Sequence, residues 1–104
     1  MKIYIDDIRD QPDSSWILVR DLESAMELIK ESIERITVIS FDHDLGTIND
    51  IPVTSIPIAE YLEELAYNGQ YPSQLKLQVH SANPVGIKNL NAIFKSIDRF
   101  NENV

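Results

Sequence analysis

Three stretches of the sequence place side chains capable of chemistry directly after a short apolar run. These side chains are Asp6-Asp7 after residues 3–5, Asp42-His43-Asp44 after residues 36–41, and His80-Ser81-Ala82-Asn83 after residues 75–79. Carboxylates are preferred ligands of hard divalent cations, and imidazole, with a reference pKa of about 6.5, transfers protons near neutral pH. Metal binding and acid-base catalysis are therefore the chemistry that these residues can perform if the fold brings them together.

The apolar runs have the character of strands in a parallel sheet. Residues 36–41 are rich in β-branched side chains and are soon followed by Gly46, a pattern typical of a buried strand. In open α/β sheets, ligands bind just outside the carboxyl ends of the strands, where the strand order reverses. We therefore expect the three sets of polar side chains to converge on one site at that edge of the sheet.

Four strands are expected in all, at residues 2–6, 16–19, 36–41 and 75–79. Right-handed crossovers between them give a mostly parallel sheet. The simplest order places the first strand beside the 36–41 strand in the middle, with the 16–19 strand outside one and the 75–79 strand outside the other. The switch point then lies between the acids after the first strand and Asp42.

Three helices are expected from capping residues and apolar spacing. Their predicted N-cap residues are Asp21, Ser55 and Asn83. Polar or irregular composition predicts loops at residues 7–15 and 46–54, and the last residues, 101–104, are expected to fray. The whole chain, residues 1–104, is interpreted as one domain because its length is near the common domain size.

The composition indicates an ordinary globular protein with an acidic surface. The formal net charge is -8, and the nine Lys and Arg residues are scattered along the chain. This argues against stable binding of duplex nucleic acid, which needs clustered basic residues, although a small phosphate ester can bind through a metal. The chain has no cysteine and no apolar stretch near the about 20 residues of a membrane helix. We therefore expect a cytoplasmic protein that does not bind membranes.

Polar and glycine residues form a pattern that extends over nearly the whole chain. Its three blocks are Ile5-Asp6-Asp7-Ile8-Arg9 with Pro12 and Trp16, then Ser40-Phe41-Asp42-His43-Asp44-Leu45-Gly46, then Val79-His80-Ser81-Ala82-Asn83-Pro84-Val85-Gly86 with Asn89. In this order they resemble the cyclic-phosphate processing receiver-like domain family of bacteria and phages. The resemblance implies an α/β fold, a three-layer receiver-like (flavodoxin-like) sandwich with a shortened, mostly parallel four-stranded sheet. It also implies action on cyclic phosphates in RNA repair.

The wider receiver fold assigns the metal ligands. Receiver domains hold Mg²⁺ with an acidic pair after the first strand and an Asp at the end of the third, positions matched here by Asp6, Asp7 and Asp42. The hydroxyl position after their fourth strand is matched by Ser81-Ala82. Their fifth strand, with its Lys, is missing from this chain, which weakens the interpretation of Asp42 as a phosphorylation site.

The two histidines have no counterpart in phospho-relay receivers and favour acid-base chemistry. Opening a cyclic phosphate requires an activated water and a protonated leaving oxygen, so we predict His80, His43 and Asp42 as the catalytic residues. His80 is the stronger candidate because it directly ends its strand, whereas alternation can point His43 back into the sheet. Asp44, before Leu-Gly, is instead expected to accept hydrogen bonds from nearby backbone amides.

Four further residues are candidates for holding the substrate. They are Ser81, Asn83, Arg9 and Gly86. Structural roles are alternatives for three of them: Asn83 as a helix cap, Arg9 in a surface ion pair with Asp10 or Asp13, and Gly86 as a point where a neighbouring strand approaches.

Two functions are left open by the sequence. The first is Mg²⁺-dependent hydrolysis of a cyclic phosphate, either at the 3′ end of an RNA or in a cyclic nucleotide. The second is a receiver-like module without catalysis that binds a phosphorylated ligand in the same pocket or a partner protein through its acidic surface. Metal-dependent turnover would distinguish the enzyme from the binding module.

Overall fold

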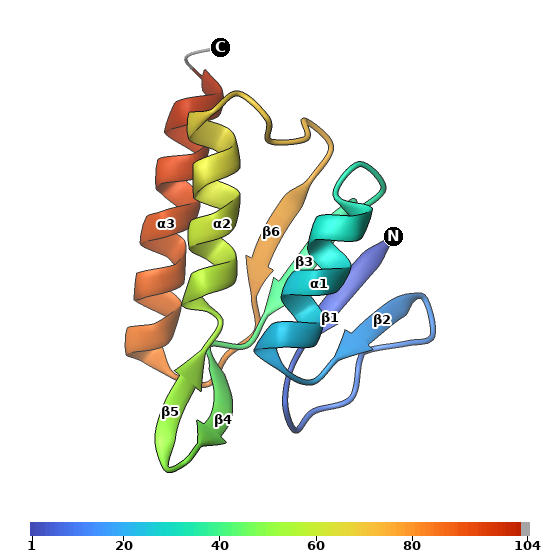
Figure 1. Cartoon of the computed structure of the whole chain (residues 1–104), viewed down its shortest axis with the longest axis vertical. Coiled ribbons are helices and arrows are strands. Elements are labelled where there is room, and N and C mark those ends of the chain that lie inside the picture. Colours follow the sequence, from blue (N-terminus) through green and yellow to red (C-terminus); the bar gives the residue numbers. More distant parts are fainter. Residues whose placement is uncertain (103–104) are drawn as a thin grey trace.

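The computed structural model describes residues 1–102, arranged around a four-stranded sheet (Figure 1). In chain order the elements are β1 (Lys2–Ile5), β2 (Trp16–Val19), α1 (Leu22–Ser32), β3 (Val38–Phe41), β4 (Asp44–Ile48), β5 (Ile51–Thr54), α2 (Ile56–Tyr67), β6 (Lys76–Val79) and α3 (Pro84–Glu102). All the predicted strands and helices are present. Three of the strands are one or two residues shorter than expected, and β3 begins at Val38 instead of residue 36.

The sheet has the predicted strand order. Its strands pair as β2-β1-β3-β6, and every pair is parallel. The ladder continues beyond the strands, because the amide of Asp42 donates to the carbonyl of Ile5 and the amide of His80 donates to the carbonyl of Phe41, both at 2.9 Å. The segments leaving β1, β3 and β6 therefore stay side by side. The α/β fold with a shortened, mostly parallel four-stranded sheet of the receiver-like type is confirmed.

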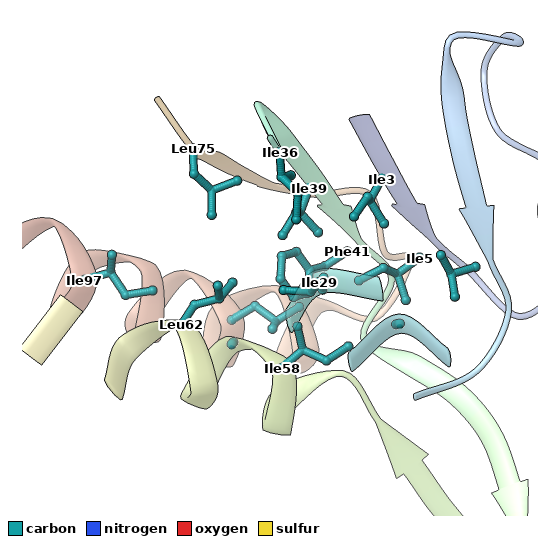
Figure 2. Packing of buried hydrophobic residues seen from close by; sticks show 14 of the residues in the cluster. Ile3, Ile5, Ile29, Ile36, Ile39, Phe41, Ile58, Leu62, Leu75 and Ile97 are labelled. Carbon is teal, nitrogen blue, oxygen red and sulfur yellow. The ribbon is translucent and has the colours of Figure 1, made fainter. Parts of the chain in front are cut away.

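The hydrophobic core lies between one face of this sheet and the three helices (Figure 2). Ile3, Ile5, Ile39 and Phe41 project from the sheet into the core and are fully buried. The helices contribute Ala25 and Ile29 from α1, Ile58, Ala59, Leu62 and Ala66 from α2, and Leu90 and Ile97 from α3. Burying one large apolar side chain contributes about 1.5–3 kcal/mol, so this interface is the main source of stability for the strand ends.

The opposite face of the sheet carries no helix within residues 1–102. It presents Tyr4, Ser40 and Gln78, which lie opposite one another in the strand register. The connections from β2 to β3 and from β3 to β6 advance in the same direction, so right-handed crossovers place their helices on one side. The connection from β1 to β2 advances the other way but is a loop at residues 6–15. The second helical layer of a complete three-layer sandwich is therefore absent from the described chain.

The predicted caps are confirmed for two of the three helices. Asp21 accepts a hydrogen bond from the amide of Ser24 at 2.8 Å, and Asn83 Oδ1 accepts from the amides of Val85 and Gly86, both at 3.1 Å. Ser55 occupies the N-cap position of α2, but its side chain makes no capping hydrogen bond. Its Oγ is buried and has no hydrogen-bond partner among the described residues. The side-chain cap expected from Ser55 is thus wrong.

Residues 46–54, expected to be a loop, form most of the hairpin β4–β5, so that prediction is wrong. Asn49 and Asp50 turn the hairpin with φ values of 51° and 64°, a left-handed conformation that Asn and Asp tolerate better than most residues. The register is irregular between Asp44 and Thr47, where Gly46 has a φ of 78°. Glycine at this irregularity and proline in β5 made the segment resemble a loop in sequence.

The last helix extends further than expected. Residues 101 and 102 belong to α3 and do not fray, and the predicted fraying of residues 103–104 lies outside the described residues. None of the helices in residues 1–102 is both long and apolar enough to cross a membrane.

Candidate functional site

Three carboxylates meet at the carboxyl edge of the sheet. One oxygen each from Asp6, Asp7 and Asp42 lie within 4.8 Å of one another. They border a pocket of about 470 Å³, a size within the range of small-molecule sites. The predicted site residues that line this pocket are Asp6, Asp7, Arg9, Asp42, Ser81 and Asn83. The expected convergence of the three strand ends is therefore observed.

Asp6 is the most firmly held of the three acids. Its side chain is fully buried, and Oδ1 accepts hydrogen bonds from the amides of Ile8 at 2.8 Å and Arg9 at 2.7 Å. Oδ2 lies 3.0 Å from Nε2 of His80. Burial by itself raises the pKa of Asp6, but these hydrogen bonds outweigh it and bring the pKa below its ordinary value. Asp6 therefore stays ionised at neutral pH.

Asp42 has the opposite electrostatic environment. Burial and then the charge of Asp6 raise the pKa of Asp42, and the hydrogen bond from Ser81 only partly offsets this. Repulsion between neighbouring carboxylates, such as that of Asp6 on Asp42, is relieved when a divalent cation is bound between them. The donor set of three carboxylates also fits Mg²⁺, which takes oxygen ligands and keeps several waters. The residues of the pocket thus fit a hard metal ion.

The imidazole of His80 contacts the acid cluster through Asp6. Its Nε2 faces Asp6, its Nδ1 lies 2.7 Å from Oγ of Ser40, and its ring stacks on Tyr4 with centroids 4.0 Å apart. Burial lowers the pKa of His80 below its ordinary value, and the neighbouring Asp6 only partly offsets this. Both ring nitrogens are hydrogen-bonded within the protein, and His80 does not line the pocket.

His43 packs against the beginning of α3. A Cβ atom on Gly86 would lie 2.4 Å from Cγ of His43, so only glycine leaves room for the imidazole. Nδ1 of His43 lies 3.0 Å from Oδ1 of Asp44. Gly86 is therefore a point of close approach, as expected, but the group that approaches is His43. Neither residue lines the pocket.

The remaining candidates connect neighbouring segments. Asn83, besides capping α3, donates from Nδ2 to Oδ2 of Asp44 at 3.1 Å. Arg9 donates from one guanidinium nitrogen to the carbonyl of His80 at 2.6 Å, and the ion pair with Asp10 is made by Arg20 instead, at 2.8 Å. The alternative of a surface ion pair of Arg9 with Asp10 or Asp13 is not observed among the described residues. Arg9 joins the loop after β1 to the end of β6.

Sequence reasoning overlooked two parts of the site. Gly46 and Thr47 line the pocket because strand β4 of the hairpin borders it. Ser40 and Gln78 support His80 from the helix-free face, where Nε2 of Gln78 donates to Oγ of Ser40 at 3.2 Å. A signal for the second pair existed, because side chains alternate along a strand and Gln78 shares a face with His80. No comparable signal marked the hairpin.

Comparison with known proteins agrees with the geometry. A family model described as Cyclic-phosphate processing Receiver domain matches residues 1–96. No curated protein and no solved structure gives a significant match to the chain. The matched range includes every residue that lines the pocket.

Proposed function

The chain belongs to the cyclic-phosphate processing Receiver domain family, and from this premise we propose that it is a metal-dependent hydrolase that opens cyclic phosphates. The substrate is a 2′,3′-cyclic phosphate at the 3′ end of an RNA or a cyclic nucleotide. The observation that carries the proposal is the convergence of Asp6, Asp7 and Asp42 in one pocket. Hydrolysis would break one P–O ester bond of the ring and give a linear phosphate monoester and a free hydroxyl.

Asp6, Asp7 and Asp42 would hold the metal ion, with Mg²⁺ as the proposed species. When bound, such an ion stabilises negative charge on phosphoryl oxygens and activates water. Asp6 supplies a permanent negative charge because its hydrogen bonds keep its pKa low. Asp7 lies beside it in the lining of the pocket and is only partly buried. An ion held by these three carboxylates would still have room for oxygen ligands from substrate and solvent.

The groups that would hold the substrate phosphate line the same pocket as the three acids. Ser81 and Asn83 line it at the end of β6, next to the first amides of α3. Amides at the start of a helix favour anions, although those of Val85 and Gly86 already donate to Asn83. Arg9 adds a positive charge to the lining and is fixed by its hydrogen bond to His80.

Asp42 is the group that we propose for proton exchange with the attacking water. Of the three predicted catalytic residues it alone lines the pocket, so its carboxylate is the one placed to contact the attacking water. The proton-transfer roles of His80 and His43 stay predictions. Each imidazole would have to leave its present partner, Asp6 or Asp44, to reach a substrate.

A module that binds a phosphorylated ligand without catalysis is the second candidate function. The observation that favours it is the engagement of both histidines within the protein, which leaves no imidazole in the pocket. Such a module would retain the cyclic phosphate and release no product. The same pocket and the same acids would serve both functions.

The test is incubation of the wild type with Mg²⁺ and a panel of 2′,3′- and 3′,5′-cyclic phosphates, with linear product followed by chromatography. We expect turnover that is lost in chelator and in Asp42→Asn. Asp50→Asn is the matched control, because it removes a carboxylate at the hairpin turn, where Asn also tolerates the positive φ. Binding of a cyclic phosphate without product would favour the non-catalytic module. The absence of both binding and turnover would contradict both candidates.

A further inference from the structure

The loop that leaves β1 places an exposed isoleucine in the lining of the pocket. Ile8 is 80% exposed, the highest value among the large apolar side chains of the described residues. It lines the pocket together with its charged neighbours Asp6, Asp7 and Arg9. Every other described residue of the lining is charged, polar or no larger than alanine. Ile8 therefore supplies the large apolar surface of a pocket whose described lining is otherwise polar or small.

Four hydrogen bonds hold the backbone of the loop around Ile8. Oδ1 of Asp6 accepts from the amide of Ile8 at 2.8 Å and from the amide of Arg9 at 2.7 Å. Nη1 of Arg20 donates to the carbonyl of Arg9 at 2.8 Å, and Nη1 of Arg9 donates to the carbonyl of His80 at 2.6 Å. A β-branched side chain has few χ1 rotamers. Ile8 is thus presented to the pocket in a nearly fixed direction.

The position of Ile8 suits contact with a ligand better than packing within the protein. A large apolar side chain stabilises a fold through burial, and 80% exposure leaves most of that contribution unrealised. Single exposed isoleucines are ordinary on protein surfaces, but this one lies beside the groups proposed to bind metal and phosphate. In small-molecule sites, apolar side chains contact the body of the ligand while a few polar groups fix its orientation.

We propose that Ile8 determines specificity by packing against the nucleobase of the substrate, so that the pocket selects a nucleoside cyclic phosphate over a cyclic phosphate of a polyol. The face of a base can lie on an isoleucine side chain without losing hydrogen bonds. The hydroxyls of a polyol would lose hydrogen bonds to water in the same place, which costs binding energy. The inference rests on the proposed function, because it concerns the substrate of the same pocket.

The test compares two substrates that share a five-membered phosphate ring and differ in the base. One is adenosine 2′,3′-cyclic phosphate, and the other is the five-membered cyclic phosphate of glycerol. With Mg²⁺ present, the wild type should show the lower KM for the adenosine compound. Ile8→Thr keeps the branch at Cβ but replaces the longer arm by a hydroxyl. It should raise that KM about 10-fold, the low end of the range for an apolar group lost from a binding pocket, and leave kcat and the KM of the glycerol compound unchanged.

Two further variants serve as controls. Ile48→Thr makes the same replacement at an isoleucine that is 65% exposed and does not line the pocket, so both KM values should stay as in the wild type. Ile8→Leu retains the apolar surface and should keep the low KM for the adenosine compound. Both Ile8 variants are expected to fold, because the side chain is exposed and the backbone amide still donates to Asp6. Thermal unfolding checks this.

The outcomes separate the contact with the base from hydrolysis itself. Turnover with equal KM values for the two compounds in the wild type, or an equal rise of both in Ile8→Thr, would overturn the contact alone. If no product forms, dissociation constants of the same compounds from calorimetry replace KM. A preference for the adenosine compound that Ile8→Thr abolishes would then support the contact and contradict hydrolysis. A wild type that binds neither compound would contradict both the contact and the proposed function.

Discussion

The pocket is bordered by two walls that the chain builds in different ways. The strand-end wall consists of Asp6, Asp7, Asp42 and Ser81, which follow three adjacent parallel strands. The hairpin wall consists of Asp44, Gly46 and Thr47 in β4, all of them exposed. In the strand-end wall the backbone that carries the side chains continues the hydrogen-bonded ladder of the sheet, since the amide of Asp6 donates to Val19 and the amide of Asp42 donates to Ile5. The hairpin wall belongs to a separate two-stranded sheet that projects from the body of the molecule (Figure 1).

The hairpin is joined to the body at its base. Leu45 is buried in the core, Asp44 accepts a hydrogen bond from Asn83, and the amide of Ser55 donates to the carbonyl of His43 at 2.9 Å. Beyond this base, Ile48 and Ile51 are 65% and 67% exposed. A rigid wall holds charges at the spacing that a cation requires, whereas a projecting hairpin shapes the entrance. We therefore expect cation binding to depend on the strand-end wall and substrate access to depend on the hairpin wall.

The largest expected effect tests the strand-end wall. Asp6→Asn keeps an acceptor for the amides of Ile8 and Arg9 but removes the permanent charge, so we expect a loss of Mn²⁺ affinity beyond the about 10- to 100-fold typical of supporting residues. Calorimetric titration measures it. Asp10→Asn, which removes an exposed carboxylate paired with Arg20, is the control and should bind as the wild type does. Equal affinity in Asp6→Asn and the wild type would show that Asp6 is not a ligand.

A smaller effect is expected in the hairpin wall. Gly46 has a φ of 78°, so Gly46→Ala should cost about 1–2 kcal/mol of unfolding free energy through backbone strain. The added Cβ would also lie 3.6 Å from Oδ2 of Asp7 and narrow the pocket, so KM for a cyclic phosphate should rise. Chemical denaturation and steady-state kinetics measure the two effects.

Gly69→Ala is the control for that variant. Gly69 has a φ of 71° at the end of α2, where an added Cβ meets nothing within 4 Å. It should lose similar stability and leave KM unchanged. If both variants raised KM equally, general destabilisation and not the hairpin wall would explain the result.

The stability of the protein should depend on pH through His80, which contacts Asp6 of the strand-end wall. Burial lowers the pKa of His80 from 6.5, so the unfolded chain takes up a proton at this residue before the folded chain does. As pH falls below 6.5, the free energy of unfolding therefore decreases, until the folded protein is protonated as well. Denaturation of the metal-free protein between pH 8 and about pH 5 measures this slope. His80→Gln should flatten it, and an unchanged slope would contradict the assignment.

The smallest effect is expected at the tip of the hairpin. Ile48→Thr with Ile51→Thr replaces two exposed side chains by smaller β-branched ones that suit a strand, so stability should change by no more than about 0.5 kcal/mol per site. Mn²⁺ affinity should not change, because the tip does not line the pocket. Denaturation and calorimetry on the double variant check both statements. A clear loss of metal affinity would show that the two walls are coupled.

Much of the fold was predictable from local patterns. β-branched runs predicted the strands, capping residues such as Asp21 and Asn83 predicted two helix starts, and the handedness of crossovers predicted the strand order. The convergence of Asp6, Asp7 and Asp42 followed from that order, because parallel strands end at the same edge. These inferences succeeded because each depends on neighbouring residues or on a general topological rule.

The hairpin was missed for a physical reason. Its strands contain Gly46 and Pro52, which locally favour loops, and its turn is the pair Asn49-Asp50 without glycine. Burial of Leu45 and the bond between Asp44 and Asn83 connect the hairpin to the body, and these contacts involve partners distant in sequence. The local preference of this segment for a loop was overridden by contacts with residues distant in sequence, which a short stretch of sequence does not reveal.

The sequence by itself determined which residues end the strands and that three carboxylates share one edge of the sheet. The alternation of side chains along a strand is a local property, and the order of parallel strands follows a topological rule. Only the tertiary structure decided which of these residues face the pocket. His80 meets Asp6 across 74 positions of sequence, and His43 fits only against Gly86. Such contacts depend on the register between strands and on side-chain packing, and both are settled by the whole core at once.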